Sequence, residues 1–139
     1  FCLHWLSNPS KRLEEWFTAL APKGWLALAV PVEGSFPEWH DAAASAGVKC
    51  SALPLPSPLK LLEAIPPKCV YHEEILVITQ RQINPFSLLK PMGEVGAQST
   101  PQPKLGIASL RQLSRLWHRD KEDGKAELTW LIKILLVQK

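Results

Sequence analysis

The sequence has few glycines, and none of them belongs to a nucleotide-binding loop pattern. Seven glycines are scattered over 139 residues, and no Gly-x-Gly-x-x-Gly segment occurs. Loops of that kind let the backbone approach a bound nucleotide closely, because glycine has no Cβ atom. The chain by itself therefore lacks the usual sequence signature of a nucleotide or dinucleotide site.

Metal-ligating and disulfide-forming residues are also scarce. The cysteines are Cys2, Cys50 and Cys69, without a Cys-x-x-Cys pair, and the four histidines share no ligand spacing. An odd number of cysteines at such spacings argues against a disulfide framework and against a zinc site. We therefore expect no metal ion and a cytoplasmic, reducing environment.

Long apolar runs and a strong charge of one sign are absent as well. No apolar run reaches the roughly 18 residues that a membrane helix needs, so no membrane partner is expected. The net charge of +3 is too small to predict nucleic-acid binding, and basic residues are not interleaved with aromatic ones.

What the sequence does contain is an alternation of apolar runs and helical periodicities. Two apolar runs flank a helix early in the chain, which predicts a β-α-β unit and a parallel sheet in an α/β fold. We expect helices over about 9–20, 37–46, 58–64, 84–92 and 107–119, and strands over 1–6, 25–30, 70–82 and 128–137. The mixed composition of 70–82 predicts one covered and one partly exposed face. Because the chain starts inside a strand-like run, we expect it to be a piece of a longer protein.

Two short motifs resemble the second half of class I S-adenosylmethionine-dependent methyltransferases. Residues 3–6 read LHWL and precede Asn8-Pro9 and a helix, similar to the end of the fourth strand in that family. Residues 20–26 read LAPKGWL, which looks like the family's L-x-P-G-G turn into the fifth strand.

A third segment narrows the resemblance. Residues 88–97 read LLKPMGEVGA, similar to the L-L-x-x-L-K-x-I-G-A segment of the malonyl-acyl carrier protein O-methyltransferases of biotin synthesis. Residues 128–130, LTW, resemble the start of the last strand in that subfamily. The resemblance implies methyl transfer from S-adenosylmethionine to the free carboxylate of a malonyl group on acyl carrier protein.

The resemblance also implies a fold. The family has a Rossmann-like sheet in the order 3-2-1-4-5-7-6, with strand 7 antiparallel. Residues 1–139 would form a single partial domain, the C-terminal half, with strands 4-5-7-6 and flanking helices. The glycine-rich cofactor loop belongs to the other half, so the resemblance implies that this fragment alone is inactive.

Candidate site residues follow from the same resemblance. His4 and Trp5, at the end of strand 4, would face the methionine end of S-adenosylmethionine. Their alternatives are a solvated loop histidine and a core aromatic residue. No catalytic acid or base is expected, because a carboxylate nucleophile is already ionised near neutral pH. A malonyl carboxylate would bind a cation, and Arg81 and Lys90 are the candidates, with a solvated surface role as their alternative.

Three arginines are spaced four residues apart in the helix predicted over 107–119. Arg111, Arg115 and Arg119 would lie along one face and dock an acidic acyl carrier protein. The alternative is a solvated helix face. A competing function for the whole chain is a non-catalytic methyltransferase-like interaction module, which forms a homodimer through the exposed edge of the strand at 1–6 or binds a protein partner.

Overall fold

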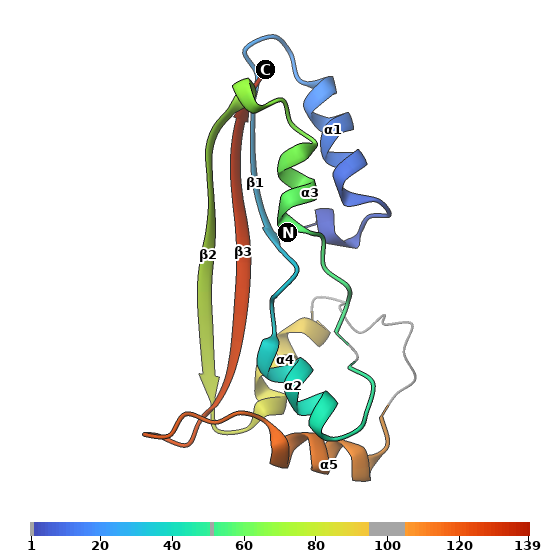
Figure 1. Ribbon diagram of the computed structural model, residues 1–139, viewed down its shortest axis with the longest axis vertical. Coiled ribbons are helices and arrows are strands. Elements are labelled where there is room, and N and C mark those ends of the chain that lie inside the picture. Colours follow the sequence, from blue (N-terminus) through green and yellow to red (C-terminus); the bar gives the residue numbers. More distant parts are fainter. Residues whose placement is uncertain (1, 51, 95–104) are drawn as a thin grey trace. The chain divides into compact units, whose positions relative to one another are not determined.

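The structure, a computed structural model, describes residues 2–50, 52–94 and 105–139, which form a mixed α/β arrangement (Figure 1). The chain divides into two compact units. The first consists of Phe1–Ser35, Pro54–Ile78 and Trp130–Lys139, and the second of Phe36–Leu53 and Thr79–Thr129.

Three strands form one sheet in the order β1-β3-β2, with bounds Trp25–Pro31 for β1, Val70–Gln82 for β2 and Ala126–Gln138 for β3. The pairing of β1 with β3 is antiparallel, from Trp25 opposite Gln138 to Pro31 opposite Ile132. Figure 1 shows β3 running opposite to β2 as well. The last strand of the chain thus lies between two earlier ones, and neighbouring strands are antiparallel. The predicted β-α-β unit with a parallel sheet is therefore wrong.

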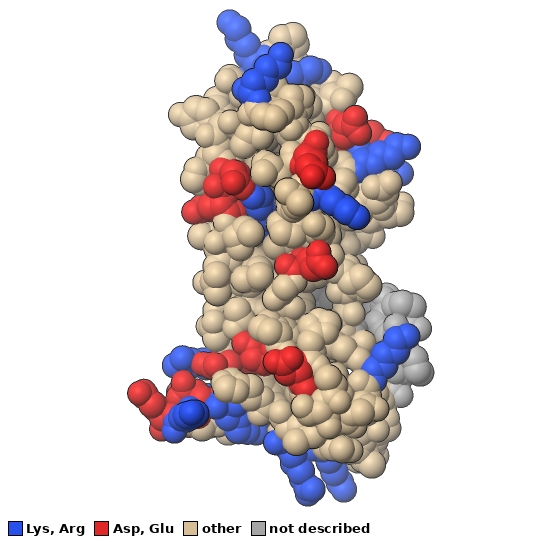
Figure 2. Space-filling view, viewed as in Figure 1, with Lys and Arg blue, Asp and Glu red and all other residues tan. Residues whose placement is uncertain are grey.

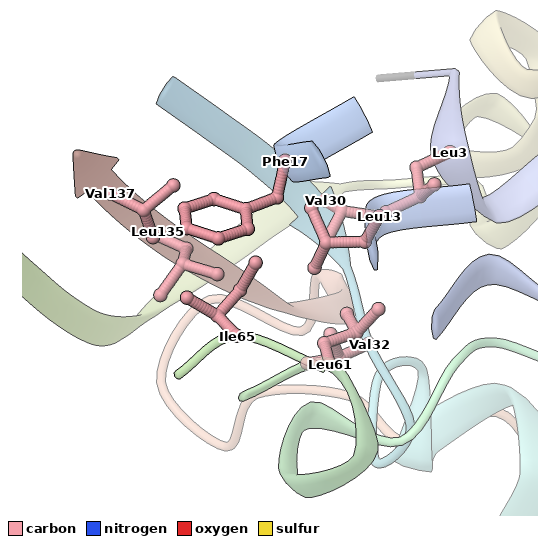
Figure 3. Packing of buried hydrophobic residues seen from close by; sticks show 9 residues of the cluster. All are labelled: Leu3, Leu13, Phe17, Val30, Val32, Leu61, Ile65, Leu135 and Val137. Carbon is pink, nitrogen blue, oxygen red and sulfur yellow. The ribbon is translucent and has the colours of Figure 1, made fainter. Parts of the chain in front are cut away.

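Helices α1, Pro9–Ala19, and α3, Pro58–Glu63, pack on one face of the sheet in the first unit (Figure 1). Their apolar side chains meet those of β1 and β3 in one cluster, shown in Figure 3. Each large aliphatic side chain buried there contributes roughly 1.5–3 kcal/mol. The buried members are Leu3, Leu13, Phe17, Val30, Val32, Leu61, Ile65, Leu135 and Val137.

Local sequence explains how α1 begins. The Asn8 side chain accepts a hydrogen bond from the Lys11 backbone N–H at 3.3 Å, and Pro9 occupies the first turn. The turn that follows α1 requires Gly24, because a Cβ atom there would lie 2.8 Å from the Ala21 carbonyl oxygen. A short 3-10 helix, Pro67–Cys69, precedes β2.

The second unit contains α2, Pro37–Ser45, α4, Pro85–Glu94, and α5, Ile107–Leu116. Two tryptophans form its centre: the rings of Trp39 and Trp117 stack with centroids 6.4 Å apart. The Trp117 indole N–H donates to the Glu127 carbonyl oxygen at 2.7 Å, so the ring is buried with its polar atom satisfied.

The prediction of a strand over residues 1–6 is wrong. Leu3–Trp5 form a 3-10 helix, with Trp5 N–H bonded to the Cys2 carbonyl at 3.0 Å and Leu6 N–H to the Leu3 carbonyl at 3.1 Å. Strand 4 of the expected 4-5-7-6 order is therefore not formed, and β1 is the sheet edge on that side. A strand needs a partner for its backbone groups, and these residues satisfy them locally instead. Leu3 is still fully buried in the cluster.

The expected burial of 70–82 is also wrong. Apart from Val70, every residue of β2 is exposed, on both faces of the strand. The reason is its place at the sheet edge: α1 and α3 cover β1 and β3, and Val70 alone of β2 packs against their cluster. The mixed composition of 70–82 gives no information on how far those helices extend over the sheet.

Candidate functional site

The candidate cofactor residues lie in the first unit, in the 3-10 helix Leu3–Trp5. The rings of His4 and Trp5 contact each other with centroids 4.8 Å apart, and Trp5 is 42% exposed, so it is not a core aromatic residue. Burial lowers the pKa of His4 below its ordinary value, as does the positive charge of the N-terminus. His4 Nδ1 is buried and makes no hydrogen bond with the described part of the chain. An unsatisfied buried polar atom is costly, and a polar ligand group would satisfy it.

The two candidate cations for a substrate carboxylate are placed differently in the second unit. Arg81 Nε lies 2.9 Å from Glu127 Oε1, and Arg81 Nη2 lies 3.6 Å from Asp120 Oδ2. Its guanidinium thus links β2 to β3 and to the turn that precedes β3. Lys90 lies on the exposed side of α4. Two carboxylates thus accompany the Arg81 guanidinium.

The three arginines are brought together, although not on one helix. Arg111 and Arg115 are one turn apart on α5, whereas Arg119 follows the helix, which ends at Leu116 rather than at 119. All three line one open pocket of about 410 Å³, which we call the arginine pocket. Figure 2 shows Lys and Arg side chains projecting on the side where α5 lies. The lining residues are Ile83, Asn84, Pro85, Phe86, Arg111, Ser114, Arg115 and Arg119.

The opposite wall of the arginine pocket is the start of α4. Asn84 Oδ1 accepts a hydrogen bond from Phe86 N–H at 3.0 Å, and Ser87 N–H donates to the Asn84 carbonyl at 3.0 Å. The first free N–H groups of the helix are therefore already bonded within the chain. Positive charge in the pocket comes from the guanidinium groups and not from the helix end.

Arg119 is held in place by the backbone around it. Its Nη1 donates to the Ile83 carbonyl at 2.9 Å and to the Gly124 carbonyl at 3.1 Å. These bonds tie the start of α4 to the turn before β3. Carbonyl oxygens carry no formal charge, so the guanidinium keeps its full positive charge in the pocket.

Nearby carboxylates are occupied by other cations. Glu127 pairs with Arg81 and lies 3.7 Å from His118, and Asp123 pairs with Lys125 at 2.8 Å. Hydrogen bonds from the backbone N–H groups of Glu122 and Asp123 lower the pKa of Asp120, with a further contribution from Arg81. Within the described residues, Arg111 and Arg115 have no ion pair or hydrogen-bond partner.

Sequence reasoning missed the most unusual charged residue. Lys133, in the middle of the apolar run of β3, has a side chain only 4% exposed, and its ammonium group pairs with the Glu73 carboxylate of β2. A signal was present, because Lys133 interrupts the run of aliphatic residues in the final strand. Sequence reasoning also missed that residues 83–86 line the arginine pocket. The only sequence signal there was the helix start at Asn84-Pro85.

Other features bear on the class of site. In residues 2–50, 52–94 and 105–139 no cluster of three or more His, Cys, Asp or Glu side chains could hold a metal ion. The described helices include none that is both long and apolar enough to span a membrane. Residues 95–97, the end of the LLKPMGEVGA segment, lie outside the described residues.

Comparison with known proteins identifies no relative: neither protein-family models nor curated proteins match this chain.

Proposed function

We propose that this chain is the substrate-side half of an S-adenosylmethionine-dependent methyltransferase of the cytoplasm, acting on the free carboxylate of a malonyl group on acyl carrier protein. The observation that carries this is the sheet order β1-β3-β2, with β3 antiparallel to both neighbours. The resemblance implies the same arrangement for strands 5, 7 and 6 of the family, in which the last strand inserts between two strands of common direction. The sequence motifs at 20–26 and 88–97 support the same reading.

The proposed methyl transfer to a carboxylate requires little acid or base catalysis from this chain. The malonyl carboxylate would be the nucleophile, and it needs no base because it is already ionised near neutral pH. The cofactor supplies the electrophilic methyl group, and the protein aligns the reactants and neutralises charge. In this proposal Arg81 and Lys90 are the candidates for holding the malonyl carboxylate, and Arg81 also orients the end of β2 through its pairs with Glu127 and Asp120.

His4 and Trp5 would contribute to the cofactor site. The unsatisfied Nδ1 of His4 and the exposed ring of Trp5 fit a polar, partly aromatic ligand. They are too few to hold it alone, since the chain contains no glycine-rich loop. We therefore expect the 139-residue chain to show no saturable binding of S-adenosylmethionine at micromolar concentrations by calorimetry. A saturable isotherm would show that the principal cofactor contacts lie within this chain.

The arginine pocket is the proposed contact with acyl carrier protein. In the methyltransferase that contains this chain, Arg111→Glu with Arg115→Glu is expected to lower kcat/KM for malonyl-acyl carrier protein about 100-fold at low salt. Loss of two favourable charge pairs at roughly 1–1.5 kcal/mol each gives this magnitude. Turnover of a small malonyl thioester should change little, and Lys11→Glu with Lys60→Glu in the first unit is the matched control. Equal kinetics of variant and parent would exclude docking at this pocket.

A second candidate is a non-catalytic module that binds a protein partner or a second copy of itself. The edge predicted for such pairing, residues 1–6, is not a strand. The observation that favours the module is instead the exposed strand β2, where Tyr71, Ile75 and Val77 are among the apolar side chains in contact with solvent. Exposed apolar edge strands favour pairing with another chain. Light scattering tests the self-pairing form of this module, which predicts a concentration-dependent dimer, whereas the methyltransferase half requires none.

A further inference from the structure

The arginine pocket is open and is lined by both basic and apolar side chains. The basic ones are Arg111, Arg115 and Arg119, and Ile83 and Phe86 supply apolar surface beside them. Ile83 is 78% exposed, so its side chain is accessible to a ligand. A volume of about 410 Å³ is within the range of sites for small organic ligands. The pocket therefore suits a small molecule with a charged group at one end and an apolar group at the other.

The positive charge of the pocket selects the ligand's head group. Three guanidinium groups line the pocket, and no acidic residue of the described chain lines it with them. A single carboxylate would neutralise only one of the three charges. A phosphate monoester carries a charge of about −1.5 to −2 at neutral pH and presents three acceptor oxygens. Arginine binds such a group with two parallel hydrogen bonds.

The geometry of α5 fits the same group. Arg111 and Arg115 are four residues apart, so their Cβ atoms lie about 5–6 Å from each other on one face of the helix. Both guanidinium groups are without partners in the described residues, and Arg119 is fixed by two carbonyl oxygens. One anchored and two adjustable cations can converge on one tetrahedral anion.

We propose that the arginine pocket binds a phosphate monoester that carries a short apolar or aromatic arm. The phosphate contacts Arg111 and Arg115, with Arg119 adding charge from its fixed position. The arm lies on Ile83 and Phe86. This ligand site goes beyond the proposed function, and it uses the arginines that the proposed function assigns to acyl carrier protein, so the two ligands would compete for the pocket.

Calorimetric titration of the 139-residue chain with three probes tests the proposal. Phenyl phosphate should bind saturably with one site, inorganic phosphate about tenfold more weakly, and benzoate about tenfold more weakly than phenyl phosphate. Arg115→Gln should weaken binding of both phosphates about tenfold or more, the effect of one lost charge-assisted hydrogen bond. Ile83→Ser should weaken binding of phenyl phosphate alone, because inorganic phosphate has no arm.

Controls make each outcome decisive. Arg12→Gln removes an exposed arginine of the first unit that pairs with Glu15, and it should leave all three affinities unchanged. The circular dichroism spectra of the variants establish that each one is folded. Benzoate binding as tight as phenyl phosphate would overturn the proposal in favour of a carboxylate site. An unsaturable phosphate isotherm, or an equal loss in Arg12→Gln and Arg115→Gln, would overturn it as non-specific attraction.

Discussion

The Glu73→Ala variant is expected to lose about 2–3 kcal/mol of unfolding free energy. Its partner Lys133 is almost fully buried, and without Glu73 the ammonium charge would be left without a counterion. Removing one partner of a buried pair costs about 3–5 kcal/mol. The lower figure applies here because Glu73 is itself 44% exposed, so water can replace part of its effect. Urea denaturation followed by circular dichroism measures the change.

The matched variants are Lys133→Met and the double variant Glu73→Ala with Lys133→Met. Methionine has a similar length and no charge, so Lys133→Met should be neutral or stabilising, and it should rescue the Glu73→Ala loss.

The Lys133–Glu73 pair also predicts a pH dependence of the unfolding free energy. Burial lowers the pKa of Lys133 below its ordinary 10.5, so the unfolded chain binds more protons than the folded one. Stability should therefore rise with pH between that lowered pKa and about 10.5, and Lys133→Met should abolish this rise. A loss in Glu73→Ala that Lys133→Met does not rescue would contradict the role given to this pair.

The Glu38→Ala variant should show the second large effect, about 2–3 kcal/mol. The carboxylate of Glu38 on α2 accepts two hydrogen bonds from Thr129 of β3, from the backbone N–H at 2.9 Å and from the hydroxyl at 2.5 Å. Hydrogen bonds to a charged group contribute about 1.5–3 kcal/mol, and their loss leaves the Thr129 N–H without its partner. Thermal unfolding of the variant measures the cost.

Asp41 provides the control on the same helix. It is exposed and has no hydrogen bond or ion pair with the described residues, so Asp41→Ala should change stability by less than about 0.5 kcal/mol. Glu38→Gln keeps an oxygen acceptor for the Thr129 N–H and should lose only about half as much as Glu38→Ala. Equal effects of Glu38→Ala and Asp41→Ala would mean that helix propensity, and not the Thr129 contact, explains the change.

Local sequence signals predicted most of the elements well. The strand Val70–Gln82 has the expected bounds, and α1 begins at Pro9 with Asn8 as its cap. A helix was predicted over about 37–46, and α2 ends at Ser45, shortly before Gly47 with its positive φ of 64°. Such features depend on a few neighbouring residues, so a sequence pattern is sufficient to locate them.

Features that depend on distant contacts were predicted poorly. Residues 1–6 have a strand-like composition, but pairing requires a neighbour, and Leu3–Trp5 form a 3-10 helix instead. The exposure of β2 depends on how far α1 and α3 extend over the sheet, which composition does not encode.

The candidate site was predicted in part. Four-residue spacing predicts that the three arginines lie together on one helix face. They do line one pocket, but Arg119 lies beyond the end of α5. The wall at 83–86 is contributed by a different element, and Arg81 is occupied by two acids that lie about 40 residues later in the chain. Only the folded chain brings these residues together.

Methyl transfer by the complete methyltransferase that the proposal requires, with this chain as its substrate-side half, tests the proposed function most directly. With radiolabelled S-adenosylmethionine and malonyl-acyl carrier protein, we expect label on the carrier as a base-labile methyl ester. Acetyl-acyl carrier protein, which lacks the free carboxylate, should remain unlabelled. A folded protein that binds malonyl-acyl carrier protein but transfers no methyl group to it, and binds no S-adenosylmethionine, would contradict the proposal.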